Sequence, residues 1–414
     1  MTKHIFSILL LLALPCLGLR AQSAMSFADF MARVSEKNAS YLVEKYNIDI
    51  ATANEQAARV VSDPELSLDY SNNEDWSLQM GQSYELGLGW SFSFGNVRGA
   101  RMKLAETEKD ITVQAVSDFF NNLRSEAAAA YAEAWASARR ESLMKDAYEN
   151  MRRVASGDSL RLVQGDLSRT DALQSSLEAK AMRNEYLAAC SESRNALHAL
   201  SMLAGGESIS AVSPELNYNS MVPALPLEEL IQLARDNRSD LKVAELTKKF
   251  SNDNLRLVNA SRAMEMGVSL GYSYNTEVRN EIAPAPKFNG FTVGVSIPLK
   301  FSSMNRGEKA AAKAAVLQSE KAYEAAVLQI DTDVMQAYNS LRSAEEILRS
   351  YDSSILSDAA AVLESRSSAY RRGDSPLYEL LAAQRSYNEI AAAYVDACAG
   401  YFCALAEMER ALAL

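Results

Sequence analysis

The chain contains little histidine, cysteine or proline for its length. Its 414 residues include two histidines, four cysteines and nine prolines. His4 lies in an apolar N-terminal segment, so only His198 lies in the rest of the chain. One histidine supplies neither a cluster of metal-ligating imidazoles nor the base of a serine-histidine-aspartate triad. We therefore expect no enzymatic activity, no metal centre and no cofactor.

The N-terminal segment has the pattern of a secretory signal peptide. Lys3 precedes an apolar run at residues 5–14, and Ala21 offers a small residue at a cleavage point. The apolar run is too short to cross a bilayer as a helix. We assign residues 1–21 to the signal peptide and expect an extracytoplasmic mature chain. Lipidation at Cys16 is an alternative that the preceding proline disfavours.

The cysteines and the charge balance exclude two further classes of protein. Cys190, Cys398 and Cys403 are an odd number with no close pairing pattern, so they are not a disulfide framework. The formal net charge is −11, with 53 acidic against 42 basic residues. An acidic chain repels the phosphates of nucleic acid. We therefore expect no nucleic-acid partner.

The sequence consists of two similar halves. Leu66–Ser71 reappears as Val268–Ser273, and Gly165-Asp166 reappears as Gly373-Asp374. The offset between the copies is about 200 to 208 residues, which is far too long for a solenoid repeat. This pattern indicates duplication of a whole unit.

A segment with three of the nine prolines separates the halves. We assign this linker to residues 207–226, the first structural repeat to residues 22–206 and the second to residues 227–414. Long stretches with little proline predict long helices in both repeats. The helices are predicted at 26–61, 97–162, 168–203, 227–260, 305–371 and 375–413. The last has apolar residues at alternating three- and four-residue steps, which predicts coiled-coil packing.

Each half also contains a pair of alternating stretches that predict a β-hairpin, at about 64–95 and about 264–301. Bulky apolar residues alternate there with glycine, serine and other small or polar residues, which gives each strand one apolar face. The residues that we expect to face lipid are Leu86, Leu88, Trp90, Phe92, Phe94, Phe291, Val293, Val295, Ile297 and Leu299.

The length and number of these strands favour a membrane barrel, although the alternation alone fits a soluble sheet equally well. Each strand is near the 9–11 residues that a tilted strand needs to cross a bilayer. Four strands are too few to close a barrel, and lipid tolerates no open sheet edge. Several copies of the chain are therefore expected to contribute hairpins to one barrel.

Three segments, together with the duplicated helix–hairpin–helix halves, carry a resemblance to a known family. They are Asp63–Leu68 at the entry to the first strand, Ser296–Leu299 leading to Asn305–Gly307, and Tyr370–Arg385. In these features the chain resembles the TolC-like outer-membrane efflux proteins over essentially all of its mature length. The segment Gly95–Arg101 is most similar to the branch that exports heavy-metal cations.

The resemblance implies a mostly helical fold with membrane strands. It implies a homotrimer in which four strands per chain form one 12-stranded barrel in the outer membrane of a Gram-negative type envelope. Long coiled-coil helices would extend into the periplasm and meet a periplasmic adaptor (membrane fusion) protein and an inner-membrane pump. The implied function is a passive exit duct of a tripartite efflux system, for heavy-metal cations or for drugs. Two alternatives stay open: a type I secretion duct and a non-channel periplasmic coiled-coil scaffold.

The resemblance also implies two kinds of site. The adaptor would dock at the turns between paired helices: Gly165, Asp166, Leu167, Ser168, Gly373, Asp374, Ser375 and Pro376. Glu379 matches an acidic gate position of the family, and Asp171 is its equivalent in the first half. Ala382 departs from the paired acid that some members carry. In a trimer each acid would form a ring whose repulsion and cation affinity govern opening. The alternatives are plain turns and simply solvated carboxylates.

Overall fold

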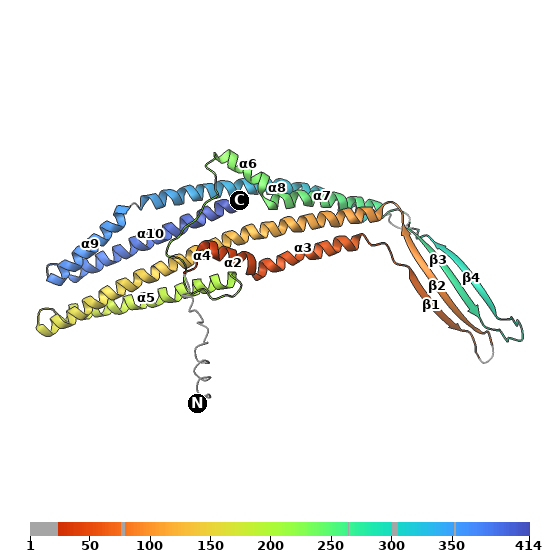
Figure 1. The fold of residues 1–414 in the computed structure, drawn as a ribbon, viewed down its shortest axis with the longest axis horizontal. Helices are drawn as coiled ribbons and strands as arrows, with labels where there is room; N and C mark the ends of the chain where they lie inside the picture. Colours follow the sequence, from red (N-terminus) through yellow and green to blue (C-terminus); the bar gives the residue numbers. More distant parts are fainter. Residues whose placement is uncertain (1–23, 76–78, 264, 300–304, 352) are drawn as a thin grey trace, which may run out of the picture. The chain divides into compact units, whose positions relative to one another are not determined.

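The computed structural model describes residues 24–75, 79–263, 265–299, 305–351 and 353–414. The predicted signal peptide, with Cys16, lies outside the described residues. The elements are shown in Figure 1 in chain order. They are α2 (Phe27–Lys37), α3 (Ala39–Ala58), β1 (Glu65–Asn72), β2 (Gln82–Ser93), α4 (Val97–Gln164), α5 (Arg169–Leu203), α6 (Leu227–Asn237), α7 (Ser239–Ala260), β3 (Glu265–Asn275), β4 (Phe288–Ser296), α8 (Arg306–Ser350), α9 (Ser353–Arg372) and α10 (Leu377–Leu412).

The chain divides into two compact units, and each takes segments from both halves of the sequence. The first unit comprises the described residues up to Val43 together with Phe119–Arg238 and Ile330–Leu414. The second comprises Glu44–Asp118 and Ser239–Gln329. The repeats that the sequence indicates are therefore not separate compact bodies, because the long helices α4 and α8 run through both units.

The long helices predicted from the lack of proline are confirmed, but three of the six are interrupted. The helix predicted at 26–61 breaks at Asn38, whose backbone is extended. The Asn38 side chain donates to the Leu203 carbonyl (3.0 Å) and accepts from the Tyr41 amide (2.9 Å), so it begins α3 as a cap. The helix predicted at 227–260 breaks in the same way at Arg238.

Arg238 is buried at its break because it pairs with an acid on a neighbouring helix. Its guanidinium donates to Asp333 Oδ2 at 2.8 Å, and only 6% of the residue is exposed. The third interrupted helix, predicted at 305–371, is divided into α8 and α9. At Asn38 and Arg238 the break coincides with a bond to a distant residue, which local composition does not mark.

The first unit has a hydrophobic core where α2, α4, α5 and α10 meet. Phe30, Tyr131 and Leu200 are fully buried there, and the rings of Phe27, Tyr131 and Phe402 contact one another. The Tyr131 hydroxyl donates to the Met25 carbonyl at 2.8 Å.

The helix α10 is, among the described residues, the one element long and apolar enough to cross a membrane by length and composition. Its apolar residues follow the heptad pattern of a packed helix. It also contains the buried polar side chains Gln384 and Glu409, which hydrocarbon would disfavour. We therefore interpret α10 as a packed helix.

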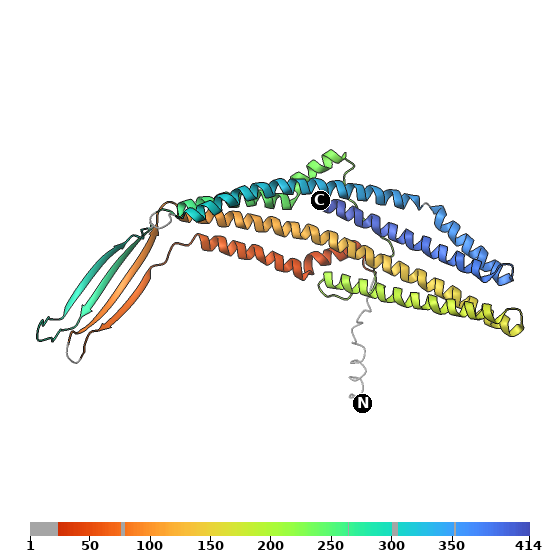
Figure 2. The same ribbon diagram turned by 180° about the vertical axis from the view of Figure 1, so that it is seen from behind.

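The second unit contains one antiparallel sheet with strand order β1-β2-β3-β4 (Figures 1 and 2). Both predicted hairpins are confirmed, and β2 pairs with β3 across the two halves of the sequence. The sheet is open, because β1 and β4 are its edges.

Apart from Phe288, which pairs with Asn275, the register places the bulky strand residues on one face, here called the apolar face. Its members are Leu66, Leu68, Tyr70, Tyr84, Leu86, Leu88, Trp90, Phe92, Met266, Val268, Leu270, Tyr272, Tyr274, Phe291, Val293 and Val295. The opposite face, here called the small-residue face, is dominated by glycine and serine. A Cβ added at Gly87 would lie 2.4 Å from Ser67 Oγ, and one at Gly294 would lie 2.5 Å from Ser269 Oγ.

Three residues predicted to lie on lipid-facing strands follow the strands instead. Phe94 lies one residue beyond β2, while Ile297 and Leu299 lie beyond β4. The chain turns after Phe94 through Gly95, which has a φ of 82°. Pro298 lacks the N–H that would continue the ladder of β4.

Candidate gate and docking site at the helical turns

Two helical turns lie side by side at one end of the first unit (Figures 1 and 2). One joins α4 to α5 and the other joins α9 to α10. Both turns contain a glycine with positive φ, 85° at Gly165 and 84° at Gly373. The sequence prediction of paired turns is confirmed.

The two turns have the same backbone hydrogen bonds. In the first, the Asp166 amide donates to the Arg161 carbonyl at 2.9 Å and the Gly165 amide donates to Leu162 at 3.2 Å. In the second, the Asp374 and Gly373 amides donate in the same pattern, at 2.9 and 3.0 Å. These are paired bonds of the Schellman type, which need a left-handed residue such as glycine. The duplication thus preserves a specific turn geometry.

Both gate candidates sit at the third position of the helix that follows each turn. Ser168 caps α5: its Oγ donates to Asp171 Oδ2 at 2.8 Å and accepts from the Asp171 amide at 3.1 Å. The Ser168 hydroxyl thus satisfies a free amide of the first turn, as an N-cap does, and also binds the Asp171 carboxylate. Within one chain Asp171 therefore stabilises the start of α5.

Glu379 is held by a different set of partners, because Pro376 caps α10 without a side-chain hydrogen bond. Its Oε2 accepts from the Ser375 hydroxyl at 2.8 Å and from Arg366 Nη1 at 2.6 Å. The ion pair with Arg366 joins α9 to α10 near the turn. The Glu379 carboxylate therefore has two partners in the chain and is not simply solvated.

A buried cluster next to the turns has no counterpart in the sequence prediction. The Tyr370 hydroxyl donates to Asp158 Oδ2 at 2.8 Å, and the two residues are 5% and 2% exposed. The Arg161 guanidinium lies 5.8 Å from the centre of the Tyr370 ring and 3.9 Å from Asp158. Burial, and then the hydrogen bond to Asp158, raises the pKa of Tyr370 above its usual range. The cluster therefore connects α4 to α9.

Sequence reasoning missed this cluster because nothing local distinguishes Asp158 from the exposed acids of a long helix. Tyr370 is the first residue of the segment Tyr370–Arg385, which carries the family resemblance, but the sequence assigns no role to it. The only shared cue is that both precede a glycine turn, Asp158 by seven residues and Tyr370 by three.

A cavity of about 350 Å³ lies between the two turns. The site residues that line it are Leu167, Asp171, Gly373, Asp374, Ser375 and Pro376, together with Arg161, Tyr370 and Leu377. The structure thus brings Asp171 to the second turn. Gly165, Asp166, Ser168 and Glu379 do not line this cavity.

Behind the turns, α4, α5, α9 and α10 share a small apolar core. Its buried members include Met151, Met182, Leu377 and Leu380. A further cavity of about 880 Å³ lies between α4 and the α9–α10 pair. The packing of the two helical pairs is therefore incomplete in the single chain.

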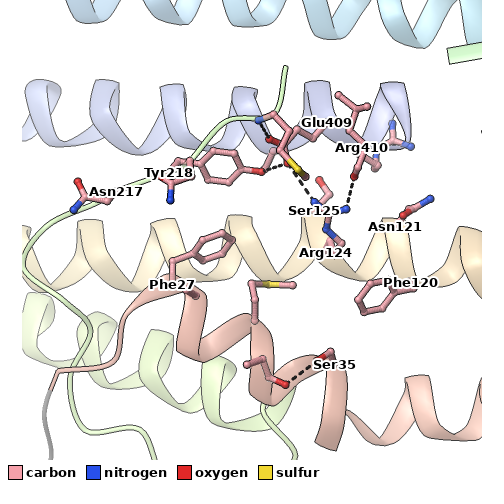
Figure 3. A pocket seen from close by; sticks show the side chains of 17 residues that line it. Phe27, Ser35, Phe120, Asn121, Arg124, Ser125, Asn217, Tyr218, Glu409 and Arg410 are labelled. Atoms are coloured by element: carbon pink, nitrogen blue, oxygen red, sulfur yellow. Dashed lines mark hydrogen bonds and ion pairs between the residues drawn. The ribbon is translucent and has the colours of Figure 1, made fainter. Parts of the chain in front are cut away.

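A second cluster of charges lies in the first unit near the C-terminal end of α10, around Glu409 (Figure 3). Glu409 is 3% exposed and accepts from the Tyr218 hydroxyl and the Met221 amide, each at 2.7 Å. Arg124 completes the set at 3.2 Å. Burial, and then the bond to Glu409, raises the pKa of Tyr218 above its usual range. These bonds fasten the segment after α5 to α4 and α10, beside a cavity of about 490 Å³.

The residues predicted to face lipid are all exposed in the single chain, from 37% for Phe92 to 84% for Phe291. Aromatic residues concentrate at both ends of the apolar face. Tyr70 and Tyr84 lie 5.1 Å apart near the hairpin loops, and Trp90 and Phe92 lie 5.0 Å apart at the opposite end.

Comparison with known proteins defines the class of the chain. Residues 230–413 match the family described as outer membrane efflux protein. The match covers the second half of the chain, and its description is that of an efflux protein and not of an enzyme. The expected resemblance is therefore confirmed.

Among relatives, the chain is 23% identical over 363 residues to the cobalt-zinc-cadmium resistance protein CzcC of Cupriavidus metallidurans. That alignment covers 86% of this chain and 82% of CzcC.

Solved structures extend the likeness to both halves of the fold. A structure of CusC, described in terms of folding and transmembrane channel formation, matches with a TM-score of 0.75 at 17% identity, over 93% of this chain and 91% of CusC. The outer membrane protein VceC of Vibrio cholerae matches with a TM-score of 0.72 at 15% identity, over 93% and 95% of the two chains. The fold is therefore that of an outer-membrane channel protein.

Proposed function

We propose that this chain is the outer-membrane exit duct of a tripartite efflux system. It acts as a passive conduit, opened when a periplasmic adaptor and an inner-membrane pump dock. The observation that carries the proposal is the open four-stranded sheet, whose apolar face is exposed in the single chain.

This sheet has the dimensions and the chemistry of a membrane-spanning wall. The strands β2, β3 and β4 have 12, 11 and 9 residues, and about 9–11 residues cross a bilayer when the strand is tilted. Aromatic residues at both ends of the apolar face match the girdles of outer-membrane barrels. An open edge is not tolerated in lipid, so the edges β1 and β4 must pair with other copies.

Three copies would close a barrel of 12 strands, with the apolar face toward lipid and the small-residue face toward the lumen. Small side chains on the inner face leave the lumen wide for cargo. In each copy the paired helices would continue the conduit into the periplasm. The turns at Gly165–Ser168 and Gly373–Pro376 would be the surface that meets the adaptor.

The gate is proposed at the same end. Three copies of Asp171 and Glu379 would place carboxylate rings around the axis, which attract cations and repel one another. The buried bond from Tyr370 to Asp158 supports the closed arrangement, because separating α9 from α4 would break a hydrogen bond to a charged group, which contributes about 1.5–3 kcal/mol.

For the cargo, we propose heavy-metal cations. The support is the likeness to CzcC, a cobalt-zinc-cadmium resistance protein. Drugs are the alternative cargo. Deletion of the gene should sensitise the host to cobalt, zinc or cadmium, and restored growth on re-expression is the control; sensitisation to antibiotics alone would favour drugs.

A planar-bilayer measurement tests the conduit directly. Purified protein should produce stepwise, cation-preferring conductance, while heat-denatured protein at equal detergent concentration is the control. Absence of any pore across the accessible range of voltage and pH would contradict the proposal. Release of the protein from membranes by salt and carbonate washes would favour a periplasmic scaffold instead.

A further inference from the structure

Basic side chains gather where the second unit passes from strands to helices. Figure 1 shows α4 beginning and α7 ending beside the sheet. The basic residues within a few positions of these ends are Arg59, Arg98, Arg101, Arg262, Arg306 and Lys309, here called the basic belt.

Most of the basic belt is exposed and unpaired. Arg98, Arg101, Arg262 and Arg306 are exposed, and none has a carboxylate of the described residues within ion-pair distance. Among the described residues, Arg98 Nε donates to the Arg59 carbonyl at 2.9 Å. The cationic groups are therefore available to an external anion.

One of these helices, α4, begins with a charge of the unfavourable sign, whereas α8 has the acid Glu308 in its first turn beside Arg306 and Lys309. The N-terminus of a helix carries partial positive charge and favours acidic residues. The helix α4 has no acid in its first turn and has Arg98 instead, whereas α2 and α5 begin with Asp29 and Asp171. The base in the first turn of α4 opposes the helix dipole, and no acid in that turn offsets it. Such departures from the local preference are expected at functional sites.

The basic belt continues the apolar face. Trp90 and Phe92 form the end of that face nearest the helices, and such aromatic residues lie at the level of lipid headgroups. Nearby acids are partly turned away: the register places Glu65 and Glu265 on the small-residue face. Asp63 is the other acid between α3 and β1.

The opposite end of the sheet has the reverse balance. The two hairpin loops carry the acids Glu74, Asp75, Glu277 and Glu281 but only the bases Arg279 and Lys287. The two ends of the sheet therefore differ in charge: the basic belt lies at the helical end, and acids outnumber bases in the hairpin loops.

We propose that the basic belt binds the phosphate groups of anionic phospholipids in the leaflet on the helical side of the sheet. This inference rests on the proposed function, because it requires the apolar face to lie in a bilayer. Guanidinium groups match phosphate oxygens in a bidentate geometry. Near an anionic surface each basic residue raises affinity by roughly fivefold at low salt. The belt would thereby fix the depth and tilt of the barrel.

The test compares two variants with equal charge change. The first carries Arg98→Gln, Arg101→Gln and Arg306→Gln; the control carries Lys145→Gln, Lys180→Gln and Arg183→Gln, which are exposed on α4 and α5. Each purified protein is equilibrated with equimolar phosphatidylglycerol and phosphatidylcholine, and co-purifying lipids are counted by native mass spectrometry. The ratio of phosphatidylglycerol to phosphatidylcholine should fall at least about tenfold in the first variant only.

Equal ratios in the wild type and the first variant, with unchanged circular dichroism and oligomer mass, would overturn the proposal. So would an equal fall in the control, since bulk charge would then explain the preference. Conductance recorded on the same samples separates the two proposals. A lipid preference without conductance would leave the basic belt intact and contradict the duct.

Discussion

At the residue scale, the buried hydroxyl of Tyr370 is the most consequential contact at the turns. It satisfies the Asp158 carboxylate in a place that water scarcely reaches. A hydrogen bond to a charged group contributes about 1.5–3 kcal/mol, and an unsatisfied buried carboxylate costs at least as much. Tyr370 and Asp158 therefore act as one unit.

Replacing Tyr370 by phenylalanine should lower the free energy of unfolding by about 2 kcal/mol, because Asp158 loses its donor. Denaturant titration followed by circular dichroism measures the change. The matched control is Tyr378→Phe, since that hydroxyl is on an exposed side chain with only a 3.4 Å contact to Glu379. Equal effects of the two substitutions would show that the buried bond contributes nothing.

The raised pKa of Tyr370 predicts a dependence on alkaline pH. In the unfolded chain tyrosine titrates near pH 10, and in the folded chain its pKa is higher. The stabilisation is therefore fully present below about pH 10 and is lost as the pH rises beyond it. Tyr218 behaves in the same way, so Tyr370→Phe should flatten the alkaline decline of stability only in part. An unaltered decline, measured as Tm between pH 8 and 11, would contradict this assignment.

Neutralising both gate candidates should raise conductance. Glu379→Gln with Asp171→Asn keeps hydrogen-bonding side chains at both caps, so folding should change by under about 1 kcal/mol. Single-channel recording then reports the loss of the carboxylate rings. The control variant, Asp358→Asn with Glu185→Gln, has the same charge change at exposed positions of α9 and α5. Unchanged conductance with normal assembly would remove Asp171 and Glu379 from the gate.

At the element scale, the sheet separates two chemistries by the parity of its strand residues. Leu270 pairs with Leu88 and Val293 on the apolar face, whereas Ser269, its neighbour in sequence, pairs with Gly89 and Gly294. Adjacent positions of one strand therefore meet different surroundings, which makes them a matched pair for substitution.

Leu270→Arg should destabilise the inserted protein by about 2–4 kcal/mol, because it places a guanidinium at mid-depth in hydrocarbon. Ser269→Arg should cost far less, because its side chain would extend from the small-residue face. Urea unfolding from liposomes compares the two variants. A larger loss for Ser269→Arg would mean that the apolar face does not contact lipid.

At the scale of the whole molecule, the open edges of the sheet and the incompletely packed helices support the proposed assembly with further copies. Four strands are too few for a closed barrel. The exposed apolar face and the cavity between α4 and the α9–α10 pair are the features of the single chain that the proposed assembly would cover.

The expected assembly is a homotrimer. Native mass spectrometry of protein extracted in mild detergent should give three times the mass of the mature chain, at every protein concentration that can be measured. A monomer or dimer that still conducts would contradict closure by three sheets. In the Leu270→Arg variant, the inserted fraction of the protein and the trimer signal should decline together.

Three features show which parts of the structure can be predicted from the sequence. The strand pairs and the glycine turns are read directly, because alternation and positive φ are local requirements of the chain. The breaks at Asn38 and Arg238 are not, because each depends on a partner more than 90 residues away. The predicted strands extend one to three residues too far, at Phe94, Ile297 and Leu299, because the apolar character of the sequence continues after strand pairing stops.

By itself, then, the sequence determined the duplicated design, the apolar face and which stretches are helical, since each follows from a pattern within a single segment. Only the tertiary structure decided which charges are buried. Asp158 with Tyr370, and Glu409 with Tyr218, come together from distant helices and loops. A local pattern reports which residues share a face of an element, whereas burial of a charge depends on which other element covers that face.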